Sequence, residues 1–250
     1  MRSQLTPLQL TQLQARGHLL NSHLLSGSAS ANAINLGSHF LRGALLYPVS
    51  KLKLKQRVRG LTASVLIGSR TSERAKVRVL NQRLGIDPCY SAKHQLAPQC
   101  EARLLTLCGL DGLRREFWLA PQSALAWRVL KAAAQADGVG LVEISGFRSV
   151  EYQAGLIQGK LCRGQTITQI LNVSAAPGFS EHHTGRAVDI ADSHELANRS
   201  FLTEAFELTA SYAWLVQNAA RFGFTQSFGR DNRHGIAYEP WHWCHRQQAS

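Results

Sequence analysis

The stretch PGFSEHHTGRAVDI, residues 177–190, constrains the fold of this chain more than any other part of the sequence. It places two adjacent histidines before Gly185, and the residues after Gly185 alternate as in a β-strand. Along that strand Asp189 points to one side, while Val188 and Ile190 point to the other. We therefore expect Asp189 to face a cleft while its two apolar neighbours anchor it in the core.

The spacing of further polar residues indicates a metal site. His182 lies seven residues before Asp189, and His242 follows much later in the chain. Two imidazoles and one carboxylate leave one position of a tetrahedral zinc ion open, as in a catalytic site. Glu239, three residues before His242, is close enough to reach a zinc-bound water as a general base without being a ligand.

The spacing alone leaves other interpretations open. Ten histidines in 250 residues will cluster somewhere, so the run could be a polar surface turn. A non-haem iron site also uses two histidines and a carboxylate, but usually with one residue between the first histidine and the acid. We interpret four further histidines as ordinary surface or core residues: His183, His194, His234 and His245.

The order of the expected elements favours an α+β fold, because helices come mostly first and strands mostly last. Expected helices cover residues 72–86, 123–138, 149–159, 166–174 and 211–223, and expected strands cover residues 141–145, 185–190, 223–228 and 235–244. Ser123 and Ser149 are the expected N-caps of two of these helices. In the first of them Leu125, Val129 and Ala133 recur at helical spacing and are expected to share an apolar face.

The net positive charge of the chain arises entirely from its N-terminal half. Residues 1–120 contain 17 Lys+Arg and 5 Asp+Glu, whereas residues 121–250 contain 11 of each. The half with the histidine cluster is electrically balanced, so its function need not involve a polyanion. We predict that residues 1–75 are a basic, disordered arm or a spurious extension, with a targeting segment as the alternative. Residues 76–250 are the predicted catalytic domain.

Cysteine spacing and hydropathy exclude two further classes of protein. The five cysteines form no CxxC pair, which argues against a zinc ribbon. Cys89 and Cys100 could be bridged, although free thiols are equally compatible with the sequence. No apolar run approaches the roughly 20 residues that span a bilayer, so we expect no transmembrane segment.

Four blocks of sequence resemble a known family. SEHHTGRAVDI matches the signature S-x-H-x-x-G-x-A-x-D, and YEPWHW contains the signature E-P-W-H. SGFRSVEYQ resembles a third block, S-G-[FY]-R-S followed by Gln, and WLVQNAARFGF resembles the helix before the closing strand. The four blocks occur along the chain in the same order as in the VanY-type zinc D-Ala-D-Ala carboxypeptidases, which are LAS-type peptidases. The resemblance to this family covers roughly residues 80–245. The resemblance implies a small antiparallel sheet flanked by helices, with zinc in a central cleft.

The resemblance also implies roles for particular residues. Its zinc ligands would be His182, Asp189 and His242. Glu239 would be the catalytic base, and Arg148 would stabilise the oxyanion or grip the substrate. Ser180 and Gln153 would contact the terminal carboxylate of the substrate. The chain departs from the family at its end, where Cys244 follows; a fourth ligand there would close the site.

The resemblance implies a zinc peptidase that hydrolyses the terminal D-Ala-D-Ala bond of peptidoglycan stem peptides. L,D-carboxypeptidase, an endolysin-type endopeptidase and an inactive wall-binding protein of the same fold are the alternatives. A different alternative is a nucleic-acid or anionic-surface binder that acts through the basic arm, but this arm lacks interleaved aromatic residues. We expect a monomer with no specific nucleic-acid partner. The substrate implies a periplasmic or other extracytoplasmic location, although no secretory signal is evident.

Overall fold

The computed structural model describes residues 64–66, 70–197 and 201–246. The helices are α3 (Arg70–Arg83), α4 (Tyr90–His94), α5 (Pro121–Ala136), α6 (Val150–Cys162), α7 (Ile167–Leu171), α8 (Ser193–Ala197) and α9 (Ala210–Asn218), with 3-10 turns η2 (Glu181–Thr184), η3 (Glu204–Leu208) and η4 (Ala219–Phe222). The strands are β1 (Ser64–Leu66), β2 (Leu104–Leu110), β3 (Glu116–Leu119), β4 (Leu141–Ser145), β5 (Ala187–Asp192), β6 (Phe224–Gln226) and β7 (His242–His245).

The predicted arm, residues 1–75, lies mostly outside the described residues. Its predicted boundary falls within α3, which begins at Arg70. The division into an arm and a catalytic domain therefore remains a prediction.

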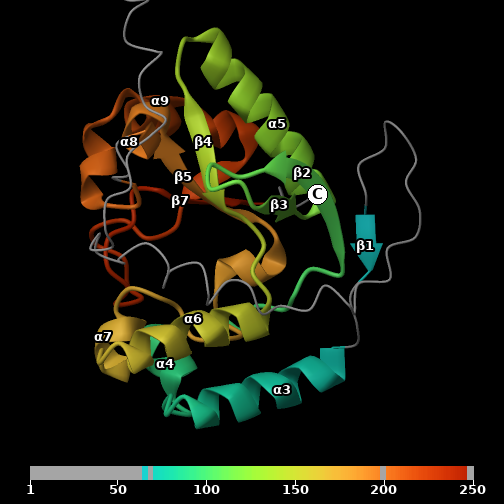
Figure 1. The fold of residues 1–250 in the computed structure, drawn as a ribbon, viewed down its shortest axis with the longest axis vertical. Coiled ribbons are helices and arrows are strands. Elements are labelled where there is room, and N and C mark those ends of the chain that lie inside the picture. The colour runs from blue at the N-terminus through green and yellow to red at the C-terminus, as the bar shows by residue number, and fades with distance from the viewer. Residues whose placement is uncertain (1–63, 67–69, 198–200, 247–250) are drawn as a thin grey trace, which may run out of the picture. The chain divides into compact units, whose positions relative to one another are not determined.

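The strands form two antiparallel sheets, one in the order β1-β2-β3 and the other in the order β4-β5-β7-β6. Helix α5 contacts β2, β3 and β4, and α8 and α9 contact β5. Figure 1 shows α5 running along the strands, with α3, α4, α6 and α7 gathered away from it. The predicted fold class, an α+β protein with a small antiparallel sheet flanked by helices, is confirmed.

The hairpin β2–β3 holds the loop that precedes α6. Its turn contains Asp111, whose Oδ1 accepts the backbone N–H of Arg115 at 2.8 Å. From β3, the carbonyl of Trp118 accepts the N–H of Phe147 at 2.9 Å. Phe147 directly precedes Arg148, so the first sheet fixes the backbone of a residue that the sequence places in the site.

The start and the buried face of α5 differ from the prediction. Ala120 is the N-cap and Pro121 occupies the first helical position, where the fixed φ of proline suits the helix and its missing N–H costs nothing. Ser123 therefore lies inside the helix and is not its cap. Leu125 and Val129 share a face, but they are 60% and 50% exposed. The buried face consists of Ser123, Ala124, Trp127, Leu130 and Ala134.

The side-chain alternation predicted for β5 is confirmed. Val188 and Ile190 are fully buried in a core that α5, α9 and β7 also line. Trp243 from β7 packs in the same core. A second core joins residues of α6 and α7 to the loops around Phe228 and Ile236. Asp189 lies on the face of β5 opposite Val188 and Ile190.

Three further expectations can be compared with the structure. Ser149 caps α6 as predicted, because its Oγ accepts the N–H of Tyr152 at 3.0 Å. All five cysteines are free thiols, so a Cys89–Cys100 disulfide is absent. Of the helices within the described ranges, none combines the length and the hydropathy that crossing a membrane requires.

Candidate functional site

Two segments far apart in the chain bring the predicted ligands together. Turn η2 carries His182 and ends at Gly185, which has φ +65° and leads into β5. A Cβ at Gly185 would lie 2.8 Å from the backbone nitrogen of Ala120, so glycine is required there. Strand β7 pairs with β5 in a register that sets Asp189 directly opposite His242. One ligand atom from each of the three residues lies within 4.8 Å of the others.

His182 presents an unprotonated nitrogen to Asp189. Its Nδ1–H donates to the carbonyl of Gly146 at 2.7 Å, which leaves Nε2 as a lone-pair acceptor. This Nε2 is buried, has no hydrogen-bond donor among the described residues, and lies 3.2 Å from Asp189 Oδ2. Burial, followed by the charge of Arg148, lowers the pKa of His182 to about 4, so the ring is neutral at pH 7. Two acceptors that face each other require a cation between them.

His242 completes the same arrangement from the other side. Its Nε2 contacts Glu181 Oε2 at 3.0 Å and its Nδ1 contacts Asp189 Oδ1 at 3.1 Å. Burial alone would lower the pKa of His242, but the hydrogen bonds to Asp189 and Glu181 outweigh it and raise the pKa to about 10. The site thus stabilises positive charge beside Asp189, and a metal ion would take the place of the Nδ1 proton.

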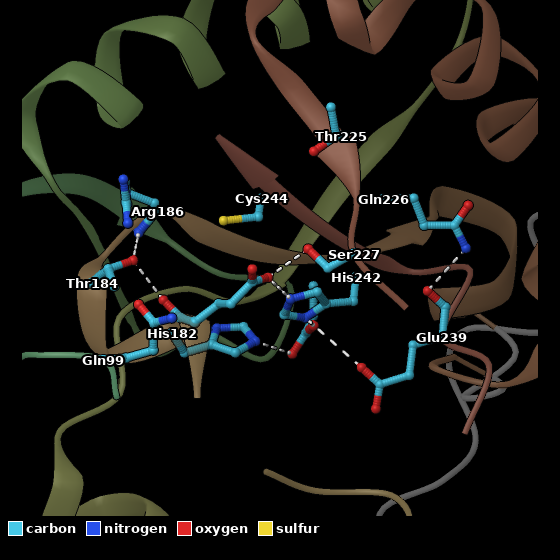
Figure 2. A network of polar contacts seen from close by, with 12 residues as sticks. Gln99, His182, Thr184, Arg186, Thr225, Gln226, Ser227, Glu239, His242 and Cys244 are labelled. Carbon is cyan, nitrogen blue, oxygen red and sulfur yellow. Dashed lines mark hydrogen bonds and ion pairs between the residues drawn. The ribbon is translucent and has the colours of Figure 1, made fainter. Parts of the chain in front are cut away.

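The donor set fits zinc. Two imidazole nitrogens and one carboxylate are ligands that zinc prefers, and the three side chains leave a coordination position free. Figure 2 shows the rings of His182 and His242 turned towards each other; their centroids are 4.9 Å apart. In the described part of the chain, the group that can share one ion does not include Cys244. Burial raises the pKa of the Cys244 thiol to about 12, so it stays protonated and is a poor ligand.

Glu181 is a further candidate site residue, which the sequence did not reveal. Besides His242, its Oε2 accepts the hydroxyl of Ser227 at 2.5 Å, and its Oε1 lies 2.9 Å from Arg246 Nη2. The carboxylate thereby holds the Nε2–H of His242 and leaves Nδ1 facing Asp189. Glu181 directly precedes the predicted ligand His182, which draws attention to it in the sequence. No local signal, however, connects Glu181 with His242, which lies 61 residues away in the sequence.

Replacing Glu181 with glutamine should weaken zinc binding about 10- to 100-fold, the range typical for residues that support metal ligands. Competition with a coloured zinc chelator measures this directly, without an activity assay. Glu207→Gln is the matched control, because Glu207 also contacts an arginine and a hydroxyl, Arg230 and Tyr238, but no histidine. Equal zinc affinity in both variants would contradict the role of Glu181.

Arg148 is fixed beside Asp189. One guanidinium nitrogen, Nη2, lies 3.2 Å from Asp189 Oδ2, and Nη1 donates to Gln153 Oε1 at 3.2 Å. Gln153 is 1% exposed, and its Nε2–H donates to the carbonyl of Ala175 at 2.7 Å. Both ends of the Gln153 amide are therefore engaged within the protein, and its Oε1 holds Arg148, which favours a positioning role over the predicted contact with substrate.

Glu239 lies near the ligands without joining them. Its Oε2 is 3.9 Å from His242 Nδ1, and its backbone N–H donates to the carbonyl of Phe228 at 3.0 Å. Burial, with a smaller contribution from the charge of Asp189, raises the pKa of Glu239 to about 7. A carboxyl group with a pKa near neutrality can both accept and return a proton at pH 7.

These residues line a cleft with a volume of about 370 Å³. Its walls include Arg148, Ser180, Glu239 and Trp241 as well as the three predicted ligands. Ser180 is buried just before η2, and its side chain does not cap this turn. Ser180 lines the cleft, where the family resemblance implies a contact with substrate.

The other histidines have structural surroundings. His183 is buried, but Nδ1 contacts the carbonyl of Arg148 at 2.6 Å and Nε2 accepts the N–H of Gly178 at 3.1 Å. His194 is exposed. His245 contacts the hydroxyl of Ser123. Among the residues that the structure describes, the group that could hold a metal ion includes none of these other histidines, in agreement with their interpretation as surface or core residues.

Known proteins resemble about half of the chain. The chain is 33% identical over 129 residues to a putative carboxypeptidase, YodJ, of Bacillus subtilis (strain 168), a match that covers 50% of this chain and 45% of YodJ. It is 36% identical over 123 residues to a D-alanyl-D-alanine carboxypeptidase of Enterococcus faecalis (strain ATCC 700802 / V583), covering 44% of this chain and 42% of that protein. The match thus spans less than half the length of either relative.

Among solved structures, the LdcB LD-carboxypeptidase is 30% identical, with a TM-score of 0.45, over 51% of this chain and 59% of that one. VanYB in complex with D-alanine-D-alanine is 29% identical, with a TM-score of 0.42, over 52% of this chain and 72% of that one. The family model described as "VanY: D-alanyl-D-alanine carboxypeptidase" matches residues 116–248, just over half of the chain. The chain belongs to the VanY D-alanyl-D-alanine carboxypeptidase family.

Proposed function

We propose that this protein is a zinc-dependent carboxypeptidase that removes the terminal D-alanine from peptidoglycan stem peptides. One observation carries the proposal: His182 Nε2 and the carboxylate of Asp189, both acceptors, face each other beside His242 in an open cleft. The family supports the substrate class. The three residues would hold the zinc ion.

In this proposal the side chains divide the chemistry. Bound zinc would supply a Lewis acid that lowers the pKa of its water to about 7. Glu239 takes a proton from the attacking water and returns it to the leaving amine. The guanidinium of Arg148 offers fixed positive charge to the carbonyl oxygen as negative charge develops there. Its contacts with Asp189 and Gln153 hold it in place beforehand.

The same contacts count against an inactive wall-binding protein. A scaffold would need neither a buried acid beside the metal position nor an arginine held over it. Burial of Glu239 is energetically costly for its charged form, as its raised pKa reflects. Such a group is expected where a proton is transferred.

Incubation of the full-length protein with purified muropeptides tests the proposal. Mass spectrometry should show the loss of one alanine from pentapeptide stems. A chelator should abolish this loss, and added zinc should restore it. Hydrolysis that is insensitive to the chelator, or no hydrolysis with zinc present, would contradict the proposal.

The same spectra separate the other candidate activities. An L,D-carboxypeptidase would shorten tetrapeptide stems, and an endolysin-type endopeptidase would release fragments from within the stem or cross-bridge. We place the D,D-activity first because the family model is described by that activity. A peptidoglycan substrate also implies an extracytoplasmic location, which we propose on that ground.

A further inference from the structure

Lys160 is a cation of the cleft for which the mechanism has no use. It lies on α6, seven residues after Gln153, and two helical turns place both residues on one face of this helix. Lys160 lines the same cleft as Arg148 and Glu239. Its Nζ donates to the hydroxyl of Ser174 at 2.8 Å, and Ser174 also lines the cleft.

Lys160 has no acidic partner. Within the ranges that the structure describes, no carboxylate oxygen lies within 4.0 Å of its Nζ. The remaining residues, 1–63, 67–69, 198–200 and 247–250, contain no aspartate or glutamate. No acidic side chain elsewhere in the sequence is therefore available to pair with it.

The acids of the cleft are engaged elsewhere. Asp189 contacts His182, His242 and Arg148, and Glu181 contacts His242, Ser227 and Arg246. Glu239 influences Lys160 only at longer range. Burial, followed by the repulsion of Arg148, lowers the pKa of Lys160. A partly buried ammonium group without a counter-ion is unfavourable unless a ligand supplies the negative charge.

We infer that Lys160 and Ser174 form a carboxylate-binding subsite of the cleft, and that the terminal carboxylate of the substrate occupies it. This inference rests on the proposed function, which brings a peptide with a free C-terminus into the cleft. The guanidinium of Arg148 is already held by Asp189 and Gln153, whereas the ammonium group of Lys160 contacts Ser174 and has two further N–H donors for a ligand. The ammonium group would bind one carboxylate oxygen, and the Ser174 hydroxyl would hold the ammonium in place.

The subsite would make the enzyme select a free chain end. A peptide that continues past the scissile bond, or ends in an amide, brings no charge to Lys160. Hydrogen bonds that involve a charged group are worth about 1.5–3 kcal/mol, or roughly 10- to 100-fold in affinity. We therefore expect wild-type protein to prefer a peptide ending in D-Ala-D-Ala over its C-terminal amide by about this factor in kcat/KM, mainly through KM.

The test compares Lys160→Met, Lys160→Arg and wild type with both peptides. Methionine keeps most of the length of the side chain without its charge, and the preference for the free acid should fall to within about threefold. Arginine keeps the charge and should retain most of the preference. Lys93→Met, a variant of an exposed lysine paired with Asp87, is the control and should behave as wild type. An unchanged preference in Lys160→Met would overturn the inference.

Two further arms separate the possible failures. A peptide with an amidated C-terminus and a free glutamyl side-chain carboxylate tests another source of the charge. If Lys160→Met weakens this peptide as much as the free acid, the terminal assignment is wrong. Binding of both peptides is also measured by calorimetry in the Glu239→Gln background, with and without Lys160→Met. If wild type cleaves neither peptide, the proposed function fails, while this binding preference still decides whether the subsite exists.

Discussion

Replacing Glu239 with glutamine should lower kcat by about 10²- to 10⁴-fold, the usual contribution of a general acid–base group, while zinc binding persists. Glutamine has nearly the same shape but cannot accept a proton from the attacking water. Glu239 Oε2 lies 3.9 Å from His242 Nδ1, and Glu239 does not belong to the group of three predicted ligands. Its replacement should therefore leave the metal in place.

The measurement pairs turnover of a D-Ala-D-Ala peptide with zinc content per protein molecule. Glu204→Gln is the control, because Glu204 is an exposed acid in an ion pair with Arg230 and lies outside the cleft residues. Full activity in Glu239→Gln would refute its role as the base. A variant that lost zinc as well would show instead that Glu239 belongs to the metal site.

Replacing His182 with alanine should abolish both zinc binding and turnover, whereas replacing His183 should spare zinc binding. The two histidines are adjacent and both are buried, but only His182 directs a nitrogen at Asp189. His183 uses both nitrogens on the backbone of Arg148 and Gly178. The pair therefore separates the metal role from the effect of removing a buried ring.

Thermal unfolding with and without zinc measures whether each variant still binds the metal. Zinc at 100 times its Kd should stabilise the wild type by about 2.7 kcal/mol. His182→Ala should show no zinc-dependent rise in Tm. His183→Ala should have a lower Tm, because it leaves buried backbone groups unpaired at about 1–3 kcal/mol each, and should still respond to zinc. A zinc response in His182→Ala would remove that residue from the metal site.

Local signals in the sequence were enough to predict several elements near the site. Strand β4 has the predicted bounds, Ser149 caps its helix, and Gly185 supports the turn into β5. The alternation along β5 also predicted which side Asp189 faces, because a strand reverses its side chains at every residue. Each of these features depends on residues within a few positions of one another.

Other features depend on residues that the sequence cannot relate to each other. The contact between Glu181 and His242 follows from the pairing of β5 with β7, a register that no local pattern specifies. The sequence likewise cannot show that Lys160 lacks an acidic partner, because this depends on which groups the carboxylates of the cleft contact in the folded structure. In contrast, the β2–β3 hairpin was missed although Asp111 and Gly112 form a recognisable turn signal. Pro121 similarly marked the start of α5.

Anomalous diffraction at the zinc edge, from crystals of the protein grown with zinc, tests the central claim most directly. The account predicts one strong peak about 2.0–2.2 Å from His182 Nε2, His242 Nδ1 and an oxygen of Asp189, with Glu239 outside this distance. A peak held by other residues, or a cleft that stays empty while zinc binds elsewhere, would contradict it.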